Sequence, residues 1–137
     1  MNEIEERCDA IEECYEFMLA YAGKGLPSDE GGQLRDHLRR AAKALNGLGK
    51  SIVNIVEHHQ LEPLAKYQAF IAVIERDARD SLAAIDLVLA QSKISSQLID
   101  NLNASIHLRA LLTDIFLMDE ILSRARRTES VPAHKSE

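Results

Sequence analysis

The sequence predicts an all-α protein in which four long helices form an antiparallel up-down-up-down bundle. Apolar residues recur at alternating steps of three and four over most of the 137-residue chain, which is the spacing of one helix face. Two of the three junctions, at 60–63 and 92–96, are short, and short junctions make neighbouring helices antiparallel. An alternative arrangement has two long helices running past one another in a dimeric bundle.

Length and composition predict one globular domain. Hydrophobic residues make up 46% of the chain and charged residues 28%, and 137 residues can bury a core without disulfides or a structural metal. The periodic pattern stops after Arg127. We therefore expect one helical domain over 1–127 and a flexible tail over 128–137.

The charge distribution and the cysteines narrow the expected partners and location. The net charge is −6, and the excess of acid lies within residues 1–22. An acidic chain without a large basic face predicts no nucleic-acid binding. No apolar run is long enough to cross a membrane or to act as a signal peptide. Cys8 and Cys14 point about 120° apart on one helix, so they cannot bridge and fit a reducing, cytoplasmic compartment.

The first helix is expected over 2–22. Its apolar seam consists of Ile4, Cys8, Ile11, Tyr15, Met18 and Ala22. Beside the seam runs an acidic stripe, made of Glu5, Asp9, Glu12 and Glu16. Like charges four residues apart repel each other on a helix. We therefore expect the stripe to face either a basic partner or solvent.

The second helix is expected over 30–59, and its outer face is basic. We expect the acidic stripe to face Arg35, Arg39 and Lys43 across the first hairpin, in which case added salt lowers the stability slightly. Gly47 and Gly49 lie within this helix. Because each glycine costs about 1 kcal/mol there relative to alanine, the pair predicts a close helix approach or a local bend.

The third and fourth helices are expected over 63–91 and 95–127, and both carry more apolar surface than one face can hold. Pro63 suits the first turn of the third helix. The fourth shows two apolar stripes: one holds Leu98, Ser105, Leu108, Leu112, Ile115 and Leu122, and the other Ile99, Leu102, Ile106, Ala110, Leu117 and Ile121. A helix with two apolar stripes must be covered on two sides, either by sister helices or by a second copy of the protein.

The surplus apolar surface favours a non-catalytic interaction or adaptor protein that forms a homodimer. No catalytic arrangement of side chains stands out, so neither an enzyme nor a cofactor is expected. The predicted contact residues are Leu87, Val88, Ile106, Ala110, Leu117 and Ile121. A polar line on the fourth helix, made of Asp100, Asn103, His107 and Asp114, is interpreted as its solvent-facing edge. The alternative for this line is a pocket lining or an oligomer contact.

Two other functions remain open. His37, with Arg40 at i+3 and Ala41 at i+4, resembles the phosphorylatable histidine of phosphotransfer domains, where a base neutralises the phosphoryl group. The remaining alternative is a small ligand or metal ion in the bundle interior near His59, His107 and Asp119.

Overall fold

The computed structural model describes residues 3–130 and, for 126–130, the backbone only. This part of the chain contains six helices and no strand, which confirms the all-α prediction. The helices are α1 (Glu3–Ala22), α2 (Leu34–Leu45), α3 (Leu48–His58), α4 (Leu64–Leu89), α5 (Ser96–Ala104) and α6 (His107–Ser130). The last helix extends three residues into the predicted tail, and 131–137 lie outside the described residues.

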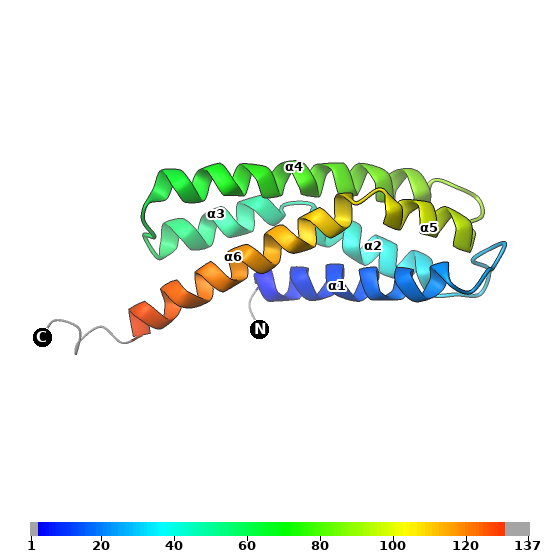
Figure 1. Cartoon of the computed structure of the whole chain (residues 1–137), viewed down its shortest axis with the longest axis horizontal. Helices are drawn as coiled ribbons and strands as arrows, with labels where there is room; N and C mark the ends of the chain where they lie inside the picture. Colours follow the sequence, from blue (N-terminus) through cyan, green and yellow to red (C-terminus); the bar gives the residue numbers. More distant parts are fainter. Residues whose placement is uncertain (1–2, 131–137) are drawn as a thin grey trace, which may run out of the picture.

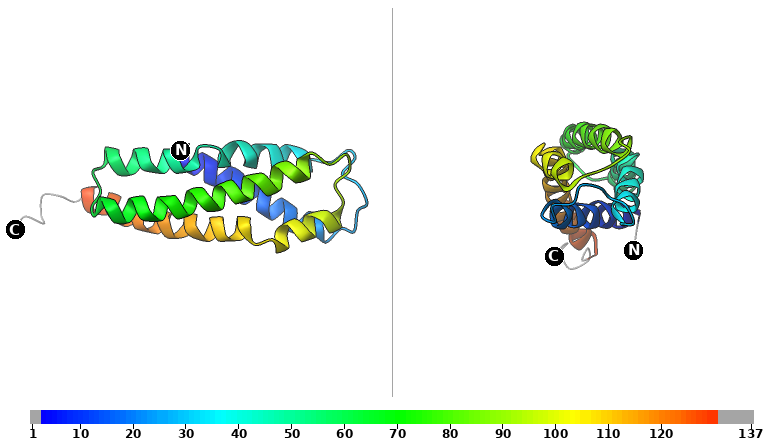
Figure 2. Two further views of the ribbon diagram at one scale, coloured as in Figure 1. Left: turned by 90° about the horizontal axis from the view of Figure 1, so that it is seen from above. Right: turned by 90° about the vertical axis from the view of Figure 1, so that its right-hand side faces the viewer.

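The helices run roughly along one long axis (Figure 1). Helix α1 packs against α2 and α5, while α4 packs against α2, α3 and α6. Seen from the end, they surround a common interior (Figure 2, right). That interior is filled by buried side chains from every helix, such as Ile11, Leu38, Val56, Ile74, Ile99 and Leu111.

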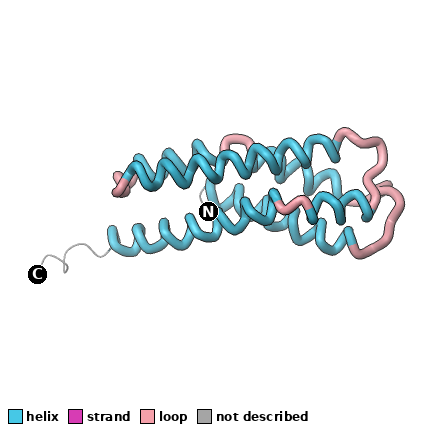
Figure 3. Tube along the Cα trace, turned by 45° about the horizontal axis from the view of Figure 1, so that its top comes forward, coloured by secondary structure: helices cyan, strands magenta, loops and turns pink. Residues whose placement is uncertain are grey.

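The predicted second helix is not continuous: a break separates α2 from α3 (Figure 3). Gly47 adopts a left-handed backbone (φ 89°) and forms the N-cap of α3, a conformation that glycine adopts without steric cost. Arg7 Nη1 donates to the carbonyls of Ala44 (2.8 Å) and Asn46 (2.7 Å), which satisfies groups that the end of α2 exposes. The bend expected at the glycines is therefore present, and the helix expected to start at residue 30 starts at Leu34.

The predicted fourth helix is also broken, between α5 and α6. Ile106 takes a left-handed backbone (φ 64°), which is rare for a β-branched residue, and Ser105 Oγ donates to the Leu102 carbonyl (2.6 Å). The break shifts the helical phase. Helix α5 buries Ile99 from one predicted stripe, whereas α6 buries Leu108 from the other. On α6 the first stripe is buried, whereas Leu117 of the second stripe is exposed.

Hydrogen bonds join the 23–33 and 90–95 connections at one end of the molecule. Ser96 Oγ donates to the carbonyl of Tyr21 (2.6 Å) and accepts from the N–H of Leu26 (2.9 Å). The Tyr21 hydroxyl donates to the Ile94 carbonyl (2.6 Å). These bonds tie the start of α5 to the end of α1.

Asp29 and Arg35 form the centre of the same end. Asp29 Oδ1 accepts from the Ile94 N–H (2.9 Å), and Oδ2 accepts from Arg35 Nε (2.6 Å). Arg35 also donates to the carbonyls of Leu89 (3.0 Å) and Gln91 (2.7 Å), at the end of α4. Burial acts to raise the pKa of Asp29, but the hydrogen bonds from Arg35 and Ile94 outweigh it and keep that pKa below its usual value.

Candidate functional site

Half of the predicted polar line faces other helices and not solvent. Asn103 and Asp114 are half-buried, and α4 contributes Asp77 and the buried Ser81 opposite them. We call these four residues the polar seam. The interpretation as a solvent-facing edge is wrong for Asn103 on α5, which donates to the Met18 carbonyl (3.4 Å), and for Asp114 on α6, which contacts Asp77 of α4. Asp100 and His107 are exposed, as expected.

Asp77 and Asp114 form a carboxyl pair across the seam. Burial raises the pKa of Asp114 to about 7, and a hydrogen bond from its side chain to Asp77 together with the Asp77 charge adds to the rise. Asp114 Oδ2 is buried and receives no hydrogen bond from the described residues. Two carboxyl groups in contact without a cation are held together by a shared proton.

Unsatisfied polar atoms are concentrated on this seam. Of the four buried side-chain atoms without a hydrogen-bond partner in the described part of the chain, three are Ser81 Oγ, Asn103 Oδ1 and Asp114 Oδ2. Ser81 and Asn103 line a small hollow of about 10 Å³ beside the α5–α6 break. An unpaired buried polar atom costs free energy. The polar groups of the seam therefore lower the stability of the fold.

Three large apolar side chains of the predicted contact set are exposed, on α6, just before it and on α4. Ile106 is 57% exposed and Leu117 50% exposed, and on α4 Leu87 is 68% exposed. Ala110 and Ile121 are half-buried. The assignment of Val88 to a contact surface is wrong: it is only 7% exposed and belongs to the core, because α4 turns it inward.

Phe116, which is 54% exposed beside Leu117, was missed by the sequence-based choice of contacts. It lies in neither of the two predicted stripes. The break at Ile106 changes which residues face outward, so the stripes of an unbroken helix could not identify it. The only indication in the sequence was that two large apolar residues, Phe116 and Leu117, follow one another.

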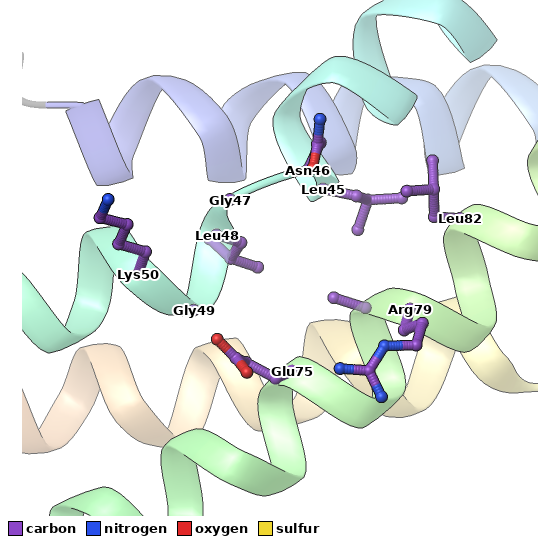
Figure 4. A pocket seen from close by; sticks show the side chains of 10 residues that line it. Leu45, Asn46, Gly47, Leu48, Gly49, Lys50, Glu75, Arg79 and Leu82 are labelled. Atoms are coloured by element: carbon purple, nitrogen blue, oxygen red, sulfur yellow. The ribbon is translucent and has the colours of Figure 1, made fainter.

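A pocket of about 210 Å³ lies between the α2–α3 break and α4 (Figure 4). Glu75 and Arg79 project from α4 towards it, and Gly49 and Lys50 border it from α3. A Cβ at Gly49 would overlap the Glu75 side chain, which confirms the close approach expected at the glycines. A carboxylate beside the N-terminal end of a helix is favourable to the helix dipole, so Glu75 already supplies an anion there.

The segment Ala44–Ser51 ends in Gly-Lys-Ser, as phosphate-binding loops do, but its structure differs from theirs. A phosphate-binding loop follows a strand, whereas helix α2 precedes this break. The Ser51 hydroxyl, which would hold a magnesium ion in such a loop, donates instead to the Glu3 carboxylate. The glycines therefore serve the helix break and the approach of Glu75.

His37 and Arg40, the predicted phosphotransfer residues, are both engaged with α1. The His37 ring stacks on Phe17, with ring centroids 4.4 Å apart. Arg40 Nη2 pairs with Glu13 Oε1 (3.1 Å). The geometry thus gives both side chains a structural role in the α1–α2 contact and does not favour phosphotransfer.

The three residues of the predicted ligand or metal site do not come together. His59 caps the end of α3, His107 begins α6 and is exposed, and Asp119 is exposed further along α6. Among residues 3–130, no group of three or more histidine, cysteine or acidic side chains could hold a metal ion. No interior ligand site is formed by this set.

Two of the three basic residues assigned to the acidic stripe, Arg35 and Arg39, pair with other acids. Arg35 pairs with Asp29, and Arg39 pairs with Asp36 on its own helix (3.7 Å). Burial raises the pKa of Glu12, and the charges of Asp9, Glu16 and Asp119 add to the rise. The expected match to Arg35 and Arg39 is therefore wrong, because these arginines bind other groups while α6 brings Asp119 to the stripe.

We expect sodium chloride to stabilise the protein, which reverses the sequence-based prediction. Screening of the repulsion around Glu12 should raise the melting temperature by about 2–4 °C between 0.05 and 0.5 M salt. Circular dichroism melts measure this. Asp119→Asn should weaken the response, whereas Asp100→Asn, an exposed site on α5, should leave it unchanged. A melting temperature that falls with salt contradicts the arrangement.

Both cysteines are free, as expected from their spacing. Burial raises the pKa of each thiol to about 12. For Cys8, the charges of Glu12 and Asp119 add to the effect of burial. Thiols with such pKa values stay protonated near neutral pH and do not act as nucleophiles.

Comparison of the chain with family models, with curated proteins and with solved structures found no match. In the described residues, no helix is both long and apolar enough to cross a membrane.

Proposed function

We propose that this chain is a non-catalytic, cytoplasmic interaction protein built on an antiparallel four-helix bundle, and that it forms a homodimer through the outer face of α6. The observation that carries the proposal is the exposure of Phe116 and Leu117 on α6 and of Ile106 immediately before it. Large apolar side chains grouped on a surface mark contact sites more often than isolated ones do. Leu87 on α4 is a further exposed apolar side chain.

The pattern on α6 is complementary to itself. Arg109, Thr113, Phe116 and Glu120 are spaced by four, three and four residues and are all exposed, so they form one stripe along the helix. If two copies pair antiparallel about the midpoint of this stripe, Arg109 of each copy meets Glu120 of the other. A twofold contact of this kind closes on itself, which supports a second copy as the partner.

The groups at this contact can be buried at little cost. Thr113 Oγ1 donates to the carbonyl of Arg109 (3.0 Å), so its hydroxyl needs no outside partner. Glu120 pairs with Arg124 (3.0 Å) on the surface of α6. Because an exposed pair of this kind contributes little, its exchange for Arg109 of a second copy costs little free energy.

The size of the face predicts a weak dimer. From Ile106 to Arg124 the helix is about 27 Å long, and a strip about 10 Å wide gives about 300 Å² per copy, below the roughly 800 Å² of a standard interface. We therefore expect a dissociation constant of about 10–100 μM. Such a dimer forms and separates with concentration.

Sedimentation equilibrium between 5 and 500 μM tests the proposal. The wild-type chain should change from monomer to dimer over this range. Phe116→Glu should keep it monomeric, because it places a charge in the centre of the contact. Leu19→Glu changes an equally exposed leucine on α1 and should leave the dimer intact.

A charge exchange tests the orientation of the two copies. Arg109→Glu alone should weaken the dimer, since it places two acids opposite each other, and Glu120→Arg in the same chain should restore it. Wild-type protein that remains monomeric at 500 μM would falsify the homodimer. A dimer that responds to Leu19→Glu and not to Phe116→Glu would place the contact elsewhere.

A further inference from the structure

We propose that the Asp77–Asp114 pair is a pH-sensitive latch, which holds α6 against α4 while the two carboxyl groups share a proton and loosens α6 when that proton is lost. The latch does not depend on dimer formation. It rests on the position of the pair in the α4–α6 contact, on the contact between the two side chains and on the buried Oδ2 of Asp114.

The position of the pair makes it effective. Helix α6 packs mainly against α4 and only slightly against α1, so the free energy that holds α6 in place comes largely from the α4 side. With the proton present, the pair is a hydrogen bond between the two helices. Without it, the same contact brings two negative charges together in a partly desolvated place, which is unfavourable.

No other charge replaces the proton. Neither Asp77 nor Asp114 forms an ion pair with a cation in the described part of the chain. From α4, Asp77 is the only charged group that acts on Asp114. Where α6 approaches the acids of α1, it is Asp119 that acts on Glu12 and Cys8.

The direction of the pH effect follows from linkage. The folded chain raises the pKa of Asp114 to about 7, whereas the unfolded chain has the ordinary aspartate value near 4. Between these two values the folded state binds a proton that the unfolded state has released. The contribution of the pair to stability is therefore greatest at the acid end, falls as pH rises towards 7 and stays low above it.

The matched variant Asp114→Asn tests the latch. Its amide can donate to the Asp77 carboxylate at every pH and so imitates the protonated pair without titrating. At pH 3.5, below the unfolded value, its melting temperature should equal that of the wild type within about 1 °C, and at pH 8.5 it should be higher by about 4 °C or more. Asp77→Asn should behave in the same way.

Amide hydrogen exchange locates the effect within the molecule. The wild-type to variant ratio of exchange rates, taken at the same pH, removes the intrinsic pH dependence. For α6 this ratio should be close to one at pH 3.5 and well above ten at pH 8.5, since each pKa unit corresponds to a factor of ten and the pKa is raised from near 4 to about 7. For α1 and α2 it should stay near one at both pH values.

Asp80→Asn is the control, because Asp80 is an exposed acid on α4 close to Asp77. It should change neither the melting temperature nor the exchange ratio with pH. A carbon NMR titration in which the Asp114 carboxyl group has its midpoint below pH 5 would overturn the latch. So would an Asp114→Asn variant that is less stable than the wild type at both pH values.

Discussion

Arg35→Met is expected to lower the free energy of unfolding by about 2–4 kcal/mol. The guanidinium group of Arg35 binds Asp29 (2.6 Å) and the carbonyls of Leu89 and Gln91 (3.0 and 2.7 Å). Without it, the largely buried carboxylate of Asp29 loses its cation and the end of α4 loses its donors. Urea denaturation followed by circular dichroism measures the change.

Arg39→Met is the matched control. Arg39 lies one turn further along α2, is exposed and makes only a 3.7 Å ion pair with Asp36. It should change the stability by less than about 0.5 kcal/mol. If both variants lose the same free energy of unfolding, the bonds of Arg35 contribute no more than an ordinary surface ion pair. In that case Arg35 does not hold the connections at that end together.

Ile74→Ala is expected to be as destabilising, with a loss of about 3–4 kcal/mol. Ile74 lies on α4 and is completely buried. Its truncation removes apolar contacts and leaves a space at the centre of the α2–α3, α4 and α6 packing, which the surrounding helices can fill only in part. Chemical denaturation at pH 6 measures this loss while the Asp77–Asp114 pair between α4 and α6 still shares its proton.

Leu87→Ala and Val88→Ala, at adjacent positions on α4, provide the comparison. Because Leu87 is exposed and Val88 is buried, Leu87→Ala should cost less than about 0.5 kcal/mol and Val88→Ala clearly more. The measurement is made at protein concentrations too low for the dimer to form, so that a contact of Leu87 with a second copy does not contribute to the result. Equal losses at the two positions would mean that α4 is rotated relative to the arrangement described.

The candidate site was only partly visible in the sequence. The polar line containing Asn103 and Asp114 was identified from its spacing, but its environment was not, since a polar stripe faces solvent on most helices. Nothing local indicates that Asp77, 37 positions before Asp114, is its partner. A contact between two like charges is also the opposite of what charge pairing leads one to expect.

What the sequence determined by itself is the all-α class, most of the buried faces and the bend at the glycines. These depend on interactions within a few residues: helical periodicity, and the left-handed backbone that Gly47 readily adopts. Only the tertiary structure decided the break at Ile106, the direction of Val88 and the partners of Arg35. Ile106 disfavours its own backbone conformation, so its break requires α5 to be held by the bonds of Ser96 and α6 to be held by α4. Those are contacts between segments far apart in the chain, and local spacing does not encode them.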